Sequence, residues 1–244
     1  MITLHWGSEG MKYVYTIAIA GLLSVSACDA RNSSETTRYD LSLYPACQNV
    51  DDISAAPDGC VLTEEPMLHA LLVSAREGNT DVQVVADGDG GQLIQEAAQG
   101  PSLIPTLADL NGDSQPDLLI PLMTGNVNTT WAVYAANQDA TYSRLGEISG
   151  IGWGPSAGGL LAVPGRSSAA SWDVNFYDVE PGGLTRIATV ETEMREAGTV
   201  PTCRLIGTPV LGAETFEAAQ ARYCSDPAVA GIWTEGPTDG PGAN

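Results

Sequence analysis

The segment 108–120 reads ADLNGDSQPDLLI and decides the expected fold. Counted from Asp109, oxygen-bearing side chains stand at positions 1, 3, 5 and 9, which are Asp109, Asn111, Asp113 and Asp117. Calcium takes about six to eight oxygen ligands, and alternate Asp and Asn residues can all turn inward when the chain coils around the ion. The main-chain carbonyl of Gln115 would add a ligand at position 7. The spacing predicts one Ca²⁺ held by these five residues.

The residues around this loop indicate strands rather than helices. A calcium loop of the EF-hand type needs Gly at position 6 and Glu at position 12, where this chain has Ser114 and Ile120. Position 6 favours a positive φ, which a residue other than Gly tolerates poorly, so we expect reduced calcium affinity. The alternative is a metal-free turn, because Asp, Asn and Gly are also the preferred turn residues.

Short apolar or alternating segments recur along the chain, separated by Gly and Pro. Trp172, Val174 and Phe176 alternate with polar neighbours, which is typical of a strand with one buried face. The segment 87–91 (DGDGG) predicts a hairpin turn, and 214–222 predicts a short C-terminal helix. Only one repeat motif is clear, which argues against a propeller. The sequence therefore predicts an all-β fold, an antiparallel β-sandwich with the calcium loop between strands. The expected strands are 70–74, 82–86, 92–96, 118–122, 130–134, 142–148, 160–163, 171–178 and 184–191.

The loop and the apolar strand after it resemble the FG-GAP or VCBS repeat of integrin-like propellers and secreted bacterial proteins. In a narrower sense, residues 68–190 resemble small envelope proteins that are similar in fold to the periplasmic inhibitors of invertebrate-type lysozyme. This resemblance implies a β-sandwich that binds its partner through a loop. The inhibitors use a Ser-Gly-x-Tyr loop. The only Ser-Gly pair here is Ser149-Gly150, and Gly152 stands at the Tyr position, so the inhibitory residues do not carry over.

The amino terminus resembles the signal of a bacterial lipoprotein. Lys12 precedes an apolar run at 13–25 that is too short for a comfortable membrane span, and the run ends in the lipobox-like VSAC at 25–28. The resemblance implies a signal peptide over 1–27, starting at Met11, and a mature Cys28 that carries acyl chains such as palmitate. The alternative is an ordinary signal peptide without lipidation. We expect a polar tether over 28–38, one β domain over 39–233 and a disordered tail over 234–244.

Cysteine count agrees with an oxidising compartment. Setting Cys28 aside leaves four cysteines, an even number. Three pairings are possible, and we predict Cys47–Cys60 with Cys203–Cys224 because these close the shortest loops. A zinc site is disfavoured, since no C-x-x-C spacing is present. Together with the signal, this places the protein in a bacterial cell envelope, lipid-anchored and facing the periplasm or the cell surface.

Net charge and composition limit the classes of partner and of catalytic site that we expect. A formal net charge of −20 disfavours nucleic acid and favours a basic protein, such as a lysozyme, as partner. His69 is the only histidine after the signal and lies in an apolar run, so we expect a strand or core histidine rather than part of a catalytic triad. We predict a non-catalytic, calcium-binding module that contacts the membrane only through its anchor. The alternatives are a carboxylate-based enzyme acting on glycans and a structural envelope protein without a soluble ligand.

Overall fold

The fold consists of strands in which buried and exposed residues alternate, joined by tight turns whose residues have positive φ. The computed structural model describes residues 37–99, 103–193 and 201–234, and all of them belong to one compact unit. The expected signal peptide, Cys28 and residues 235–244 lie outside the described residues. Within those ranges, no helix is both long enough and apolar enough to cross a membrane.

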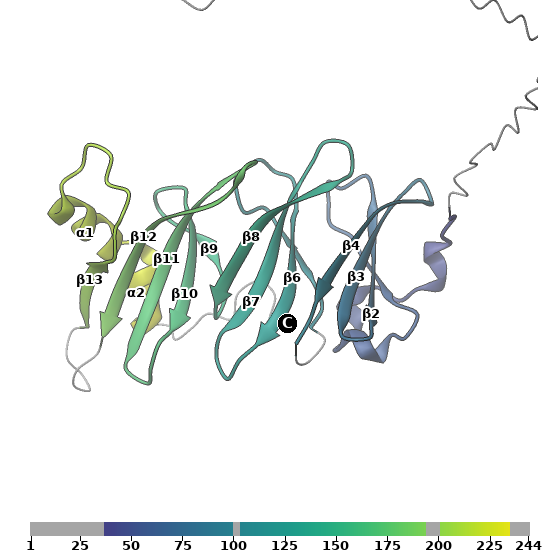
Figure 1. The fold of residues 1–244 in the computed structure, drawn as a ribbon, viewed down its shortest axis with the longest axis horizontal. Coiled ribbons are helices and arrows are strands. Elements are labelled where there is room, and N and C mark those ends of the chain that lie inside the picture. The colour runs from purple at the N-terminus through teal and green to yellow at the C-terminus, as the bar shows by residue number, and fades with distance from the viewer. Residues whose placement is uncertain (1–36, 100–102, 194–200, 235–244) are drawn as a thin grey trace, which may run out of the picture. The chain divides into compact units, whose positions relative to one another are not determined.

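The strands form three antiparallel sheets, each of which follows the order of the chain (Figure 1). The predicted all-β, antiparallel class is confirmed, and each of the nine expected strands is present. The first sheet contains β1 (Cys60–Leu62), β2 (Ala70–Arg76), β3 (Asn79–Ala86) and β4 (Asp89–Ala97). The second contains β5 (Thr106–Ala108), β6 (Asp117–Thr124), β7 (Thr129–Ala136) and β8 (Tyr142–Gly150). The third contains β9 (Gly154–Pro155), β10 (Leu161–Arg166), β11 (Ser171–Glu180), β12 (Gly183–Glu193) and β13 (Thr202–Ile206).

Two-residue turns set the register of the first sheet. Glu77 and Gly78 join β2 to β3 with φ of 48° and 81°, and Asp87 and Gly88 join β3 to β4 with φ of 54° and 83°. Two successive positive φ values match the right-handed twist of the strands on either side. The hairpin turn predicted from DGDGG at 87–91 is therefore confirmed.

The sheets pack face to face, as in a β-sandwich, but in three layers. Leu118 and Ile120 on β6 pack against the first sheet, whereas Leu119 between them packs against the third. All three side chains are fully buried. Because the second sheet is covered on both faces, its strands need apolar residues at consecutive positions, which explains the unbroken run at 118–120.

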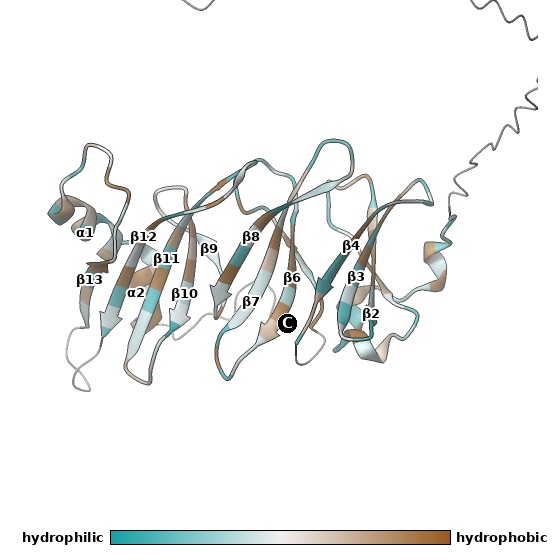
Figure 2. Cartoon of the chain, viewed as in Figure 1, coloured by the Kyte–Doolittle hydropathy of each residue, from teal (hydrophilic) through white to brown (hydrophobic). Residues whose placement is uncertain are grey.

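The third sheet is covered on its other face by two helices. Trp172, Val174 and Phe176 point into this core, and Figure 2 shows apolar and polar bands alternating along β11 and β12. Helix α1 (Phe216–Cys224) confirms the predicted helix with a start two residues later. Its Thr215 cap accepts a hydrogen bond from Ala218 N at 3.2 Å. Ala219 and Tyr223 are the buried residues of this helix, whereas Phe216 is 41% exposed.

Helix α2 (Pro227–Thr234) was not predicted. Asp226 precedes it, is buried, and accepts a hydrogen bond from Ala228 N at 2.9 Å. The other carboxylate oxygen accepts one from Ala157 N at 2.9 Å. A capping Asp followed by Pro at the first helical position is a known helix start, which was the available signal.

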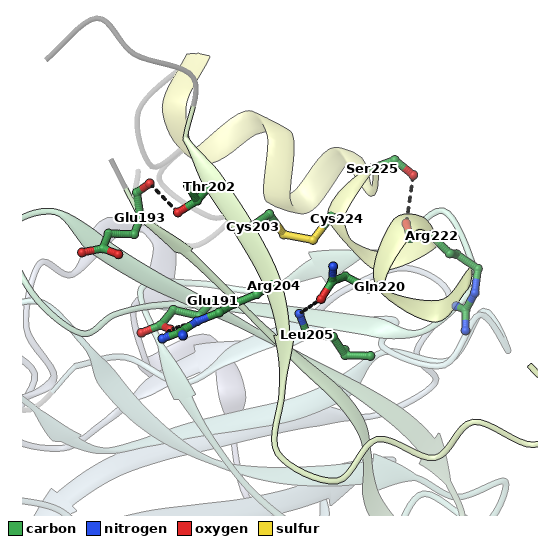
Figure 3. The surroundings of a disulfide bond; sticks show 10 residues. All are labelled: Glu191, Glu193, Thr202, Cys203, Arg204, Leu205, Gln220, Arg222, Cys224 and Ser225. Carbon is green, nitrogen blue, oxygen red and sulfur yellow. Dashed lines mark hydrogen bonds and ion pairs between the residues drawn. A yellow bond between two sulfur atoms is a disulfide. The ribbon is translucent and has the colours of Figure 1, made fainter. Parts of the chain in front are cut away.

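Both predicted disulfides are present, and each fastens a covering segment to the outer strand of an end sheet. Cys60 on β1 is joined to Cys47 in a segment of three short 3₁₀ helices, η1 (Leu41–Leu43), η2 (Cys47–Asn49) and η3 (Ile53–Ala55). Cys203 on β13 is joined to Cys224 at the end of α1 (Figure 3). In addition, Leu205 N donates to Gln220 Oε1 at 3.1 Å, so α1 also satisfies a backbone group of the edge strand.

Candidate calcium loop and its surroundings

The predicted loop connects β5 to β6 and has the backbone that its sequence suggests. Gly112 has φ of 78° and Ser114 has φ of 65°. Ser114 thus takes the left-handed conformation expected at position 6 of the loop, despite its side chain. Asp109, Asn111 and Asp113 are exposed. Ser114 holds this conformation at a modest cost in backbone strain.

The first three predicted side-chain ligands lie together and bind the loop's own backbone. Asp109 accepts hydrogen bonds from Gly112 N at 2.7 Å and Ser114 N at 3.0 Å. Asn111 Oδ1 accepts one from Asp113 N at 3.0 Å, while its Nδ2 donates to Asp113 Oδ2 at 3.1 Å. Asp113 Oδ1 accepts one from Gln115 N at 2.7 Å. These side-chain bonds hold the loop in a coil.

Asp117, the ligand predicted at position 9, is fully buried and ties the loop to the sheet. Its Oδ2 accepts a hydrogen bond from Leu110 N at 3.1 Å, and its Oδ1 accepts one from Ala136 N at 3.0 Å. Burial raises the pKa of Asp117 to about 6, these two hydrogen bonds lower it, and the charges of Asp113 and Asp109 raise it further. Asp117 is therefore a structural bridge from the loop to the end of β7.

The donor set fits calcium in its chemistry. It offers carboxylate and amide oxygens only, and a bound cation would relieve the repulsion that Asp109 and Asp113 exert on the buried Asp117. The side chains are nevertheless turned onto the backbone, and over the described ranges no three His, Cys, Asp or Glu residues form a ready metal-binding group.

A polar pocket of about 530 Å³ lies beside the loop. Asp113 and Gln115 line it from the loop, and Asn137 and Gln138 line it from the turn between β7 and β8. Asn137 is held by bonds from its Nδ2 to Thr141 Oγ1 and Ser143 Oγ, both at 3.0 Å. Gln115 is exposed and lies at an open surface pocket rather than in a closed cage.

His69 is half-buried and lies one residue before β2, so it is neither in the strand nor in the core where it was expected. Its Nε2 lies 3.1 Å from the hydroxyl of Tyr142, and the two rings meet edge to face at 5.7 Å. Burial lowers the pKa of His69, so the neutral ring is favoured. The contact joins the first sheet to the second and has the character of a packing interaction.

The Ser149-Gly150 pair does not form a protruding loop. It ends β8 and pairs with Thr129 and Thr130 on β7. A Cβ at Gly150 would lie 2.3 Å from Pro164 O, which shows how closely β8 approaches β10 there. Trp153, four residues after Ser149, packs edge to face on Trp131 at 5.0 Å. The close packing of the second and third sheets accounts for the glycine at position 150.

Sequence reasoning missed a polar network between the first and second sheets. Glu96 on β4 accepts a hydrogen bond from the Tyr134 hydroxyl at 2.6 Å and from Arg144 Nε at 2.7 Å. Tyr134 is buried, and burial together with Glu96 raises its pKa. Arg144 also pairs with Glu147 at 2.6 Å. Since 38 and 48 residues separate Glu96 from these two partners, no local pattern could have indicated it.

Comparison with known proteins adds little. No protein-family model matches the chain, and no curated protein sequence matches it. A solved structure described as "Structure of a Xanthomonas Type IV Secretion System related protein" is similar at 13% identity. The match covers 70% of this chain and 92% of that one, with a TM-score of 0.38. Likeness at this level supports no statement about function.

Proposed function

We propose that this protein is a calcium-stabilised, lipid-anchored binding module of a bacterial cell envelope, without catalytic activity, whose partner is a basic protein. The observation that carries the calcium site is the coil of the loop, with Ser114 at φ of 65° and the side chains of Asp109, Asn111 and Asp113 gathered within it. A net charge of −20 supports a basic partner through electrostatic steering. A lysozyme has the required charge.

Removing calcium should lower the stability of the protein. Ligand binding only to the folded state adds about 2.7 kcal/mol at a free calcium concentration a hundred times Kd, which is several degrees in Tm for a domain of this size. With Ser at position 6 we expect weak binding, with Kd on the order of 10⁻⁴ to 10⁻³ M. Thermal unfolding in EDTA and in millimolar calcium measures the difference.

Matched variants distinguish calcium binding in the loop from a general effect of calcium on the negative charge of the protein. Asp113→Ala should unfold at the same temperature in both buffers, because it removes an exposed ligand. Glu180→Ala, which removes an exposed carboxylate at the end of β11, should keep the full calcium effect. If the wild-type protein melts at one temperature in EDTA and in calcium, the loop is an ordinary turn and the calcium proposal is wrong.

Lipidation of Cys28 is tested by metabolic labelling with an alkyne fatty acid. The wild-type protein should take up label and fractionate with membranes, whereas Cys28→Ala should do neither, because the thiol that accepts the acyl chain is gone. Cys47→Ala serves as a control, since Cys47 is occupied by a disulfide. Label that persists in Cys28→Ala would exclude lipid anchoring at this residue.

The partner site has to be sought elsewhere than in the Ser149-Gly150 stretch. The lysozyme inhibitors use a Ser-Gly-x-Tyr loop, whereas the Ser149-Gly150 pair here lacks the Tyr and is strand paired with β7. We therefore still propose a basic protein as the partner, and we propose that it binds to a different surface of this protein.

A further inference from the structure

The segment before β1 forms an open groove with apolar walls. The three 3₁₀ helices η1 to η3 enclose a pocket of about 430 Å³. Leu43, Pro45 and Pro57 line it and are exposed, while Tyr44 and Val50 line it and are half-buried. Leu43 is 77% exposed, so its apolar side chain is accessible to a partner. The volume lies in the range of about 300–1,000 Å³ typical of ligand pockets.

The rim of this groove is acidic. Asp51 and Asp58 line it and are exposed, and none of the eleven lining residues is basic. Within the described ranges, neither carboxylate is paired with an arginine, whereas Glu96, Glu191 and Glu214 each have one. The negative charge at the rim is therefore uncompensated and available to a cationic partner.

The groove is held in shape by contacts behind it. Cys47 is fixed to Cys60, with Cα atoms 4.9 Å apart, and Val61 N donates a hydrogen bond to Pro45 O at 2.8 Å. Gly59 lies so close to β2 that a Cβ there would be 2.6 Å from Val73 O. Asp52 caps η3 through a bond from Ser54 N at 2.7 Å. A preformed groove loses little conformational entropy when a ligand enters.

We propose that this groove binds a cationic peptide segment of the partner, in which a bulky apolar side chain stands beside Lys or Arg. The apolar side chain enters between Leu43, Tyr44 and Pro57, and the flanking cation pairs with Asp51 or Asp58. This inference rests on the proposed function and deepens it by naming the surface and the chemistry of the partner. Apolar contact supplies affinity, and the acidic rim selects the charge of the segment.

Charge complementarity favours this occupant over two others. A second copy of the chain would bring another −20 of net charge to an acidic rim, so it would be repelled. Anionic lipid headgroups would meet the same repulsion from Asp51 and Asp58.

The test is a fluorescence anisotropy titration of the mature protein with a short labelled peptide of alternating Arg and Leu. The wild-type protein should bind it, and the same peptide with Glu in place of Arg should not bind. Leu43→Asp should weaken binding about tenfold, whereas Leu68→Asp should leave it unchanged, since Leu68 is 95% exposed and lies outside the groove. Asp58→Lys should weaken binding by a similar factor, and Glu180→Lys, which changes the net charge equally, should have little effect.

Several results would overturn the proposal. Equal losses in Leu43→Asp and Leu68→Asp, or in Asp58→Lys and Glu180→Lys, would show non-specific attraction to an acidic surface. Displacement of the peptide by phosphatidylcholine vesicles, or dimerisation abolished by Leu43→Asp, would assign the groove to lipid or to a second copy. A parallel titration with a lysozyme distinguishes failure of the groove proposal from failure of the proposed function. Tight lysozyme binding that Leu43→Asp leaves intact contradicts the groove alone, and binding of neither probe to wild type contradicts the basic partner as well.

Discussion

Asp117→Ala will lower the free energy of unfolding by about 2–6 kcal/mol. The carboxylate is fully buried and accepts hydrogen bonds from the backbone of Leu110 and Ala136. Alanine leaves both N–H groups without an acceptor, and each unsatisfied buried donor costs about 1–3 kcal/mol. The loop between β5 and β6 loses its attachment to β7 at the same time. We expect Tm to fall by several degrees for each 2 kcal/mol lost.

Measuring this variant in EDTA isolates the structural role from any contribution of calcium. Urea unfolding followed by far-UV circular dichroism gives the free energy. Asp113→Ala is the matched control, because it removes an exposed carboxylate of the same loop, and it should cost far less in EDTA. Asp117→Asn keeps one acceptor oxygen and should fall between the wild type and Asp117→Ala. An Asp117→Ala protein as stable as Asp113→Ala in EDTA would show that the two backbone bonds are unimportant.

Loss of either disulfide will cost about 3 kcal/mol, the chain-entropy value for a closed loop of about 15 residues. Cys47–Cys60 spans 13 residues and Cys203–Cys224 spans 21, so the two contributions should be similar. Both together are worth about 6 kcal/mol, a large part of the stability of a domain. Reduced wild-type protein should therefore unfold at a much lower temperature than oxidised protein.

Paired variants assign the effect to each bond. Cys203→Ala with Cys224→Ala should also loosen α1, and faster amide exchange at Leu205 would report this, because Gln220 on α1 accepts its N–H. Cys47→Ala with Cys60→Ala should leave that amide protected. A protein that lacks all four cysteines should not respond to reductant. If wild type melts at the same temperature with and without reductant, the disulfides do not stabilise the fold.

Residues 109–117 show which contacts of the loop the spacing of its residues could predict and which it could not. The spacing of Asp109, Asn111 and Asp113 predicted a coil, and the bonds inside that coil connect residues no more than five positions apart. The spacing also placed Asp117 in the ligand set. It could not indicate that Ala136, 19 residues away, binds the same carboxylate, because that contact depends on where β7 ends. The groove beside η1 to η3 was missed for a similar reason, since its apolar residues follow neither helical nor strand periodicity.

Local chemistry alone determined nine of the thirteen described strands, the DG turn and the first C-terminal helix, because each depends on the backbone preferences of residues a few positions apart. The short strands β1, β5, β9 and β13 were not predicted. Short loop closure singled out the two disulfides. Packing between sheets decided the rest. An apolar run such as Leu118, Leu119 and Ile120 is compatible with any buried strand. These side chains enter two different cores because one sheet packs on each face of β6. The hydrogen bonds of Glu96 with Tyr134 and Arg144 likewise depend on the packing of the first sheet against the second. These residues are far apart in sequence, so their spacing along the chain could not indicate the contacts.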